Sequence, residues 1–260
     1  MGIDAADETL LRQGELHLEG QLAAASNATL RCVVERPDGS LLRCVYKPTA
    51  GERPLWDFPP STLAQREVAM YHLSRALGFH DVPTTVWRSD GPYGPGMCQR
   101  WIDVDPDASD VAVFAPSALP SGWRGVLRAE DESGNDVVLA HTDLRDVQRI
   151  AFLDALANNA DRKAGHLLRD VGNRLWAIDH GLTFHVEPKL RTVLWGWAGE
   201  MFDDDIVDLR GIYEGVSAAL TPWLSEQEVA ATLDRLAELQ HTKRFPTPTP
   251  GWPSIPWPVF

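Results

Sequence analysis

The chain has 260 residues, a formal net charge of −13 and a sequence pI near 5.0. This acidity disfavours DNA, RNA and anionic membrane surfaces as partners, because Lys and Arg dominate binding to phosphate groups. Hydrophobic residues make up 44% and charged residues 23%, the balance of a globular protein with a substantial core. No apolar run approaches the ~20 residues that span a bilayer, and the acidic start of the chain lacks the pattern of a signal peptide. We therefore expect a cytoplasmic protein without stable membrane insertion.

The first hundred residues predict a small antiparallel sheet with one main helix. Two alternating apolar runs are separated by Arg36-Pro37-Asp38-Gly39, which predicts a hairpin because Gly tolerates positive φ. Thr62 and Gln65 predict a capping box for the helix that follows. Cys32 and Cys44 lie in the strands, where we expect small buried side chains and no disulfide framework. The expected elements are helices at 5–13 and 62–77 and strands at 29–35, 40–47, 82–88 and 96–102.

The remainder of the chain predicts a mainly helical region. Residues 103–140 are rich in Asp, Ser, Pro and Gly, and indicate a long connection with a short helix or hairpin. A helix at 143–158 has apolar residues at helical spacing, and a later helix begins at Ser225 with Glu228 completing a capping box. After Phe245 the tail is rich in Pro and Trp, which predicts extended or turn-like chain. Short strands are expected at 167–168 and 175–178.

Two short stretches carry the candidate chemistry. The stretch from Asn159 to His166 follows a predicted helix, and Ile178-Asp179-His180-Gly181 ends an apolar strand. Phosphoryl transfer requires positioning, neutralisation of charge by a metal, and a carboxylate near the attacking hydroxyl. Asp161, a group able to bind metal at His166, and a second carboxylate at Asp179 meet these requirements in the order and spacing of the protein-kinase template.

Asn159-Ala-Asp161-Arg162 followed by Ile178-Asp179-His180-Gly181 resembles the catalytic core of the phosphatidylinositol 3-/4-kinase-like superfamily, above all its type II phosphatidylinositol 4-kinase branch. Adding Val-Glu-Pro-Lys-Leu-Arg-Thr-Val-Leu-Trp-Gly-Trp, the combination is similar to an actinobacterial group of such proteins. The resemblance implies an α+β, two-lobed protein-kinase-like fold with ATP in the cleft. It places a small antiparallel sheet in an N-lobe at 1–103, a mainly helical C-lobe at 104–245 and a Pro/Trp-rich tail at 246–260.

The resemblance also implies roles for individual residues. Asp161 would be the catalytic base or orient the attacking hydroxyl, and Asp179 would hold the Mg²⁺ or Mn²⁺ that bridges the phosphates of ATP. His166 stands where these kinases have an Asn, and as a metal ligand its imidazole suits Mn²⁺ better than Mg²⁺. Lys47 would contact the phosphates, with Glu67 as its partner. The remaining contacts to ATP would come from a turn at Ser26 and Asn27, a hinge at Gln99, Arg100 and Trp101, and a pocket floor of Leu168 and Ile178.

The reaction implied is transfer of the γ-phosphate of ATP to a hydroxyl on a protein, a small polyol or an inositol lipid. Lys189 and Arg191 are placed to receive an anionic acceptor. Two other interpretations stay open: a nucleotide-binding pseudokinase that acts as a regulatory module, and a scaffold protein that docks through its Pro/Trp-rich tail. His166 can equally be a structural histidine, and each Asp an ordinary turn residue.

Overall fold

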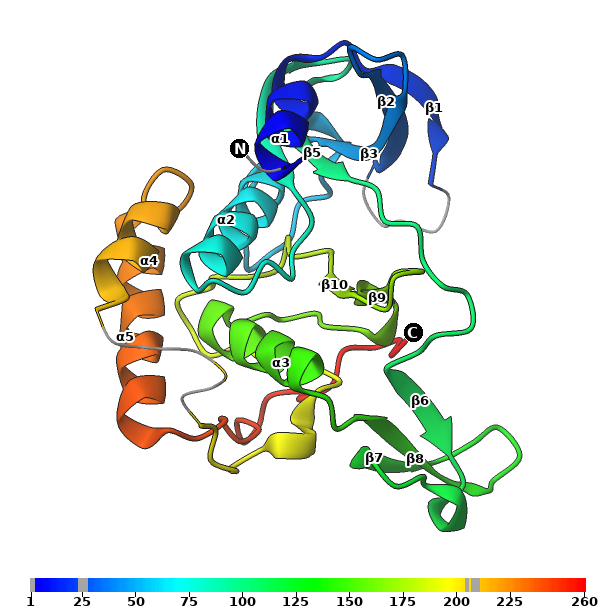
Figure 1. The fold of residues 1–260 in the computed structure, drawn as a ribbon. Coiled ribbons are helices and arrows are strands. Elements are labelled where there is room, and N and C mark those ends of the chain that lie inside the picture. Colours follow the sequence, from blue (N-terminus) through cyan, green and yellow to red (C-terminus); the bar gives the residue numbers. More distant parts are fainter. Residues whose placement is uncertain (1–2, 23–27, 204–205, 207–210) are drawn as a thin grey trace.

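The computed structural model describes residues 3–22, 28–203, 206 and 211–260 and has two lobes (Figure 1). The N-terminal lobe combines an antiparallel sheet with two helices. The C-terminal lobe contains three further helices and two small sheets within the described residues. This is the α+β, two-lobed architecture expected from the sequence.

The sheet of the N-terminal lobe is antiparallel, with strand order β1-β2-β3-β5-β4. The predicted hairpin joins β2 to β3, and Gly39 in its turn has a φ of 82°. Cys32 and Cys44 face each other across this hairpin and are buried with Leu11 in an apolar core that also contains Cys98. All three cysteines are free thiols. The elements are α1 (Ile3–Gln13), β1 (His17–Gln21), β2 (Leu30–Glu35), β3 (Leu41–Pro48), α2 (Leu63–Ala76), β4 (Thr85–Gly91) and β5 (Gly94–Arg100).

The β4–β5 hairpin lies in a different place from the predicted strands at 82–88 and 96–102. Gly91 pairs with Gly94, so the strands extend to a tight turn and both boundaries move toward it. Gly96 allows β5 to approach β3 closely, because a Cβ at this position would lie 2.3 Å from the carbonyl oxygen of Lys47. The strand that carries Lys47 is thereby held against its neighbour.

Helix α2 begins where the sequence predicts, but its cap comes from elsewhere. Thr62 makes no capping hydrogen bond through its side chain, so the predicted box with Gln65 is wrong. The carboxylate of Glu52 instead accepts the N–H groups of Leu63 (3.1 Å) and Ala64 (2.9 Å). A carboxylate at this position also interacts favourably with the helix dipole. The segment after β3 therefore fixes the start of α2.

Residues 103–140 form a more regular structure than the predicted connection. They include three strands of an antiparallel sheet with strand order β6-β8-β7. The predicted hairpin is part of it, with a turn in which Asp131 Oδ1 accepts the N–H groups of Ser133 and Asn135, each at 2.9 Å. The strands are β6 (Val111–Phe114), β7 (Trp123–Glu130) and β8 (Asp136–Thr142).

The helices of the C-terminal lobe pack around one large apolar core. Helix α5 begins with the predicted capping box, in which Ser225 N–H donates to Glu228 Oε2 at 2.9 Å. Helix α4 was not predicted from the sequence. Among the described residues, no helix is both long and apolar enough to cross a membrane. The elements are α3 (Arg145–Ala157), β9 (Leu167–Arg169), β10 (Leu175–Ala177), α4 (Tyr213–Leu220) and α5 (Glu226–Thr242).

The Pro/Trp-rich tail is extended, as predicted, and packs along the C-terminal lobe to end near β9 (Figure 1). Ser254 O accepts hydrogen bonds from Thr192 N–H (3.0 Å) and Trp195 Nε1–H (2.7 Å). Val259 O accepts the N–H of Ala164 at 2.8 Å. The tail thus contacts the loop that carries Asp161 and His166.

Candidate active site

Asp179 lies two residues after the end of β10 in an unusual backbone conformation, with a φ of 59°. Positive φ is uncommon outside glycine, although Asp tolerates it, and residues held in this way cluster at functional sites. The preceding Ile178 is anchored on both sides: its N–H donates to His166 O at 3.0 Å, and its carbonyl accepts from Arg162 Nη1 at 2.9 Å. These bonds fix Asp179 relative to the loop at 161–166.

Lys47 joins the two lobes at the centre of the site. Its Nζ lies 2.6 Å from Glu67 Oε1 on α2 and 2.8 Å from Asp179 Oδ1. The second oxygen of Glu67 accepts the N–H of His180 at 3.0 Å. Side-chain exposure is 2% for Glu67, 20% for Lys47 and 48% for Asp179, so the three charges run from the interior toward the cleft.

The charges of this group reinforce one another. Burial alone would lower the pKa of Lys47, but the carboxylates of Asp179 and Glu67 outweigh burial and raise it. Lys47 in turn holds the pKa of Asp179 well below its ordinary value. Burial raises the pKa of Glu67, against the opposing effect of Lys47. At neutral pH, Lys47 is therefore a cation and Asp179 an anion.

His166 and Asp179 are the predicted metal ligands, and the structure brings them together. His166 Nε2 lies 3.3 Å from Asp179 Oδ2. Burial lowers the pKa of His166 to about 4, so the ring is neutral at pH 7, the form that binds metals. One imidazole nitrogen and one carboxylate fit a first-row divalent ion such as Mn²⁺. The described residues contain no group of three or more His, Cys, Asp or Glu able to hold a metal, so ATP phosphates and water would complete its coordination.

Asp161 sits on a rigidly braced loop. Its N–H donates to Asn159 Oδ1 at 3.0 Å, and Asn159 Nδ2 donates to Asp154 Oδ1 at 2.8 Å. Asp154 also accepts two bonds from Arg162, each at 2.8 Å, and both side chains of this ion pair are 0% exposed. Asp154 therefore braces the loop. Burial raises the pKa of Asp161, which suits a group that accepts a proton.

Lys163 is a candidate that the sequence analysis missed. Its Nζ lies 3.4 Å from Asp161 Oδ2, and its side chain is 22% exposed. The available signal was the spacing Asp-x-Lys, which places two side chains of one extended loop on the same side. Lys163 places a positive charge beside Asp161.

Charged side chains from both lobes line a cavity of about 150 Å³. Lys47, Glu67, Asp161 and Asp179 all line it. The remaining walls include Glu52, Arg53 and Leu55 from the segment after β3, and Gly181 and Leu182 from the segment after Asp179.

The residues predicted to contact the adenine do not line this cavity. The side chain of Gln99 is buried and donates to Thr85 Oγ1 at 2.8 Å. The N–H groups of Arg100 and Trp101 donate to Thr84 O (2.9 Å) and Arg43 O (3.0 Å), so a backbone donor to adenine would have to come from elsewhere in the hinge.

Leu168 and Ile178, the predicted pocket floor, are half-buried on and beside the β9–β10 hairpin. The turn residues Ser26 and Asn27 lie outside the described residues. The contacts of these four residues with ATP stay predictions.

The predicted acceptor role of Lys189 is wrong. Its side chain is 4% exposed and forms an ion pair with Asp57 at 2.9 Å. The ammonium group also lies between the rings of Trp56 and Trp252, at 4.9 and 4.8 Å. Arg191 donates to Ala160 O at 2.6 Å. Lys189 therefore joins the segment after β3, the segment after Asp179 and the tail, and is not open to a ligand.

Comparison with solved structures identifies the fold. The Golgi casein kinase with Mn/ADP bound matches with a TM-score of 0.50 and 15% identity, over 94% of this chain and 76% of that chain. Hydra Fam20 with sugar matches with a TM-score of 0.52 and 14% identity, over 90% of this chain and 86% of that chain. The chain thus has an α+β protein-kinase-like fold. The resemblance to type II phosphatidylinositol 4-kinases stays a prediction, because these matches support no particular kinase branch.

Comparison of sequences gives a nearer relative. No model of a known protein family matches the chain. Protein Rv2133c of Mycobacterium tuberculosis (strain ATCC 25618 / H37Rv) is 42% identical over 268 residues, covering 98% of this chain and 95% of that protein. The protein therefore belongs to the same family as mycobacterial Protein Rv2133c.

Proposed function

We propose that the protein is an ATP-dependent phosphotransferase that moves the γ-phosphate of ATP to an acceptor hydroxyl. The observation that carries this proposal is the position of Lys47 between Glu67 and Asp179, on a cavity that also holds Asp161. In protein kinases, catalysis requires both the Lys–Glu ion pair and the metal-binding Asp to be in place. The pair of Lys47 with Glu67, and Asp179 beside it, support the same arrangement in this protein.

Each group then has a defined task. Lys47 binds phosphate oxygens as a point charge, and Asp179 and His166 hold a divalent cation. Such a cation, when bound, neutralises charge on the phosphates. Asp161 orients the acceptor hydroxyl and accepts its proton, for which its raised pKa is favourable. Lys163, 3.4 Å from Asp161, offsets negative charge on the phosphoryl group during transfer.

The acceptor is a hydroxyl on a protein, a small polyol or an inositol lipid. One matched structure is named for casein and another contains a sugar, which supports testing a protein and a polyol first. The phosphatidylinositol-kinase resemblance adds inositol lipid vesicles as a third class of acceptor.

The test is transfer of labelled γ-phosphate from ATP to each acceptor with Mg²⁺ or Mn²⁺. We expect transfer by the unmodified protein and a loss of about 10²–10⁴-fold in Asp161→Ala, the scale of general acid–base catalysis. Asp179→Asn should be comparably inactive. Asp136→Asn, an exposed carboxylate on β8, is the matched control and should keep full activity. Equal activity in all three variants would contradict the proposal.

The pseudokinase alternative is separated by measuring binding apart from turnover. ATP with Mn²⁺ should raise the melting temperature of the protein, because a ligand that binds only the folded state stabilises it. This rise should vanish in Asp179→Asn. A rise in melting temperature without transfer to any acceptor would favour the pseudokinase. No rise at all would show that the protein does not bind ATP with Mn²⁺.

A further inference from the structure

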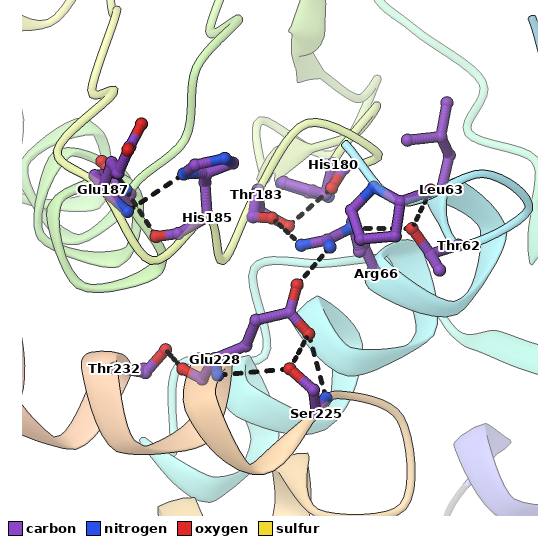
Figure 2. Close-up of polar contacts among 12 residues, drawn as sticks. Thr62, Leu63, Arg66, His180, Thr183, His185, Glu187, Ser225, Glu228 and Thr232 are labelled. Atoms are coloured by element: carbon purple, nitrogen blue, oxygen red, sulfur yellow. Dashed lines mark hydrogen bonds and ion pairs between the residues drawn. The ribbon is translucent and has the colours of Figure 1, made fainter. Parts of the chain in front are cut away.

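The residue before Glu67 on α2 links this helix to the opposite lobe. Arg66 is 1% exposed, and Figure 2 shows its guanidinium between two segments of the C-terminal lobe. Nη1 donates to the carbonyl of Thr183, and Nη2 forms an ion pair with Glu228 Oε1. The guanidinium also lies 5.0 Å from the ring of Phe58. Its buried charge is therefore matched mainly by groups of the C-terminal lobe.

Glu228 uses its two oxygens for two different purposes (Figure 2). Oε2 accepts the N–H (2.9 Å) and hydroxyl (2.8 Å) of Ser225 in the capping box of α5. Oε1 pairs with Arg66, and the two side chains of this pair are 1% and 12% exposed. A second contact joins the same two parts of the molecule: the ring of His72 on α2 stacks on Trp223, with centroids 5.5 Å apart. Helix α2 is thus attached to the start of α5.

Arg66 and Glu67 together hold the turn that follows Asp179. Glu67 Oε2 accepts the N–H of His180 at 3.0 Å, and Arg66 donates to the carbonyl of Thr183. The turn is closed by Thr183 Oγ1, which donates to His180 O at 2.7 Å. Two successive side chains of one helix therefore bind both ends of a single turn. Rotating α2 away from Lys47 would separate the buried guanidinium of Arg66 from its partners. An unpaired buried charge is costly in free energy.

We propose that Arg66 and Glu228 are positioning residues for the reaction. They hold α2 in the orientation in which Glu67 meets Lys47, and they hold the turn beside Asp179. This inference rests on the proposed phosphotransferase function and deepens it.

The ion pair between Arg66 and Glu228, here called the lock, takes the place of a control that other kinases use. In protein kinases, phosphorylation of the activation loop and movement of the helix that carries the Glu control the Lys–Glu pair. Between His180 and Trp195 the only hydroxyl side chains belong to Thr183 and Thr192, which are 0% and 4% exposed. A kinase acting on this segment would find no accessible hydroxyl. The ion pair from α5 assembles the site without such a modification.

The test makes Arg66→Met and Glu228→Gln separately, each in the unmodified protein and in the Glu67→Gln variant. Each of the first two changes should lower kcat/KM for ATP at least tenfold. Each should cause a smaller further loss in the Glu67→Gln background, because part of its effect acts through Glu67 and part through the turn at Thr183. Glu228→Gln keeps the capping box, since Gln also serves at this position, so it covers the case in which Arg66→Met fails to fold. Arg36→Met, which breaks the remote ion pair with Asp7, is the matched control and should leave kcat/KM unchanged.

The same variants separate positioning from stability. If Arg66→Met costs the same factor with and without Glu67, or lowers only the melting temperature, Arg66 is a structural residue and the proposal fails. Amide hydrogen exchange supplies a readout that needs no turnover: exchange at His180 N–H should accelerate in Glu228→Gln, and unchanged exchange would overturn the lock. If exchange at His180 N–H accelerates but the protein transfers phosphate to no acceptor, the proposed phosphotransferase function is refuted. The positioning role of Arg66 and Glu228 would still be supported.

Discussion

At the scale of single residues, His166 is the side chain that would set the cation preference of the proposed site. Lys163 N–H approaches His166 Nδ1 at 3.5 Å, which places the ring proton on Nε2, facing Asp179 Oδ2. Binding a metal through Nε2 requires the other tautomer, with the proton on Nδ1. Metal binding through Nε2 would therefore require the hydrogen bond from Lys163 N–H to Nδ1 to break.

Replacing His166 by Asn should invert the preference for cations. The amide oxygen of Asn is a hard ligand suited to Mg²⁺, whereas imidazole favours Mn²⁺. In the unmodified protein we expect ATP with Mn²⁺ to raise the melting temperature more than ATP with Mg²⁺, and the order to reverse in His166→Asn. The same order of the two cations in both proteins would show that His166 is not a ligand.

The sequence predicted the proximity of those candidate residues whose spacing along the chain is short or typical of kinases. Asp161, His166 and Asp179 lie on two neighbouring loops, and Lys47 and Glu67 on a strand and the next helix. The partners of Lys189 and Arg66 were not predictable, because each ion pair joins residues more than a hundred positions apart. A basic side chain near a catalytic loop suggests a ligand site, and only the structure shows that Asp57 and two Trp rings already surround Lys189.

At the scale of elements, the sheet formed by β6, β8 and β7 depends on one buried histidine. His141 is 0% exposed; its Nε2 accepts Gly196 N–H at 3.0 Å, and its Nδ1–H donates to Thr142 O at 2.9 Å. A Cβ on Gly196 would lie 2.4 Å from Nε2, so only glycine allows this approach. Burial lowers the pKa of His141 to about 4, with Arg124 acting in the same direction and Asp143 and Asp110 opposing it.

The neutral ring makes this contact sensitive to acid. The unfolded chain binds the proton with a pKa of about 6.5, above the value of about 4 in the fold. The contribution of His141 to stability is therefore complete above pH 6.5 and is lost as the pH falls toward 4. His141→Gln should reduce the loss of unfolding free energy between pH 7 and pH 4.5 by about 2 kcal/mol. Urea denaturation at pH 7 and pH 4.5 measures it, and an unchanged pH dependence would contradict the prediction.

The same sheet shows why sequence reasoning failed between residues 103 and 140. Side chains of β7 are mostly exposed on both faces, whereas four consecutive residues of β8, Val138 to His141, are buried. Neither strand has the alternation that marks a half-buried strand. The strands of the N-terminal lobe were found because β3 alternates regularly between exposed and buried positions.

At the scale of the whole molecule, the tail acts as a strap across the C-terminal lobe. Trp252 covers Lys189, and Ser254 and Val259 accept hydrogen bonds from the segments that follow and carry the candidate catalytic residues. The kinase-like arrangement of the lobes was predictable from motif order. The path of the tail was not, because a run rich in Pro and Trp specifies an extended chain and not the surface that it covers.

Trp252→Ala should loosen this strap. Loss of the cation–π contact with Lys189 should lower the free energy of unfolding by about 1–2 kcal/mol and speed hydrogen exchange at Thr192 N–H. Trp257→Ala is the matched control, because Trp257 lies in the same tail but is 83% exposed. If the two variants have equal melting temperatures and exchange rates, the tail does not hold this segment.

The bond between Ala164 N–H and Val259 O also sets an order of events during protein synthesis. The N-terminal lobe leaves the ribosome first, before the residues of the C-terminal lobe against which α2 packs. The catalytic loop, however, receives its last backbone partner from a residue that is translated long after the loop itself. A nascent chain that still lacks Val259 therefore lacks one backbone contact of the loop that carries Asp161 and His166.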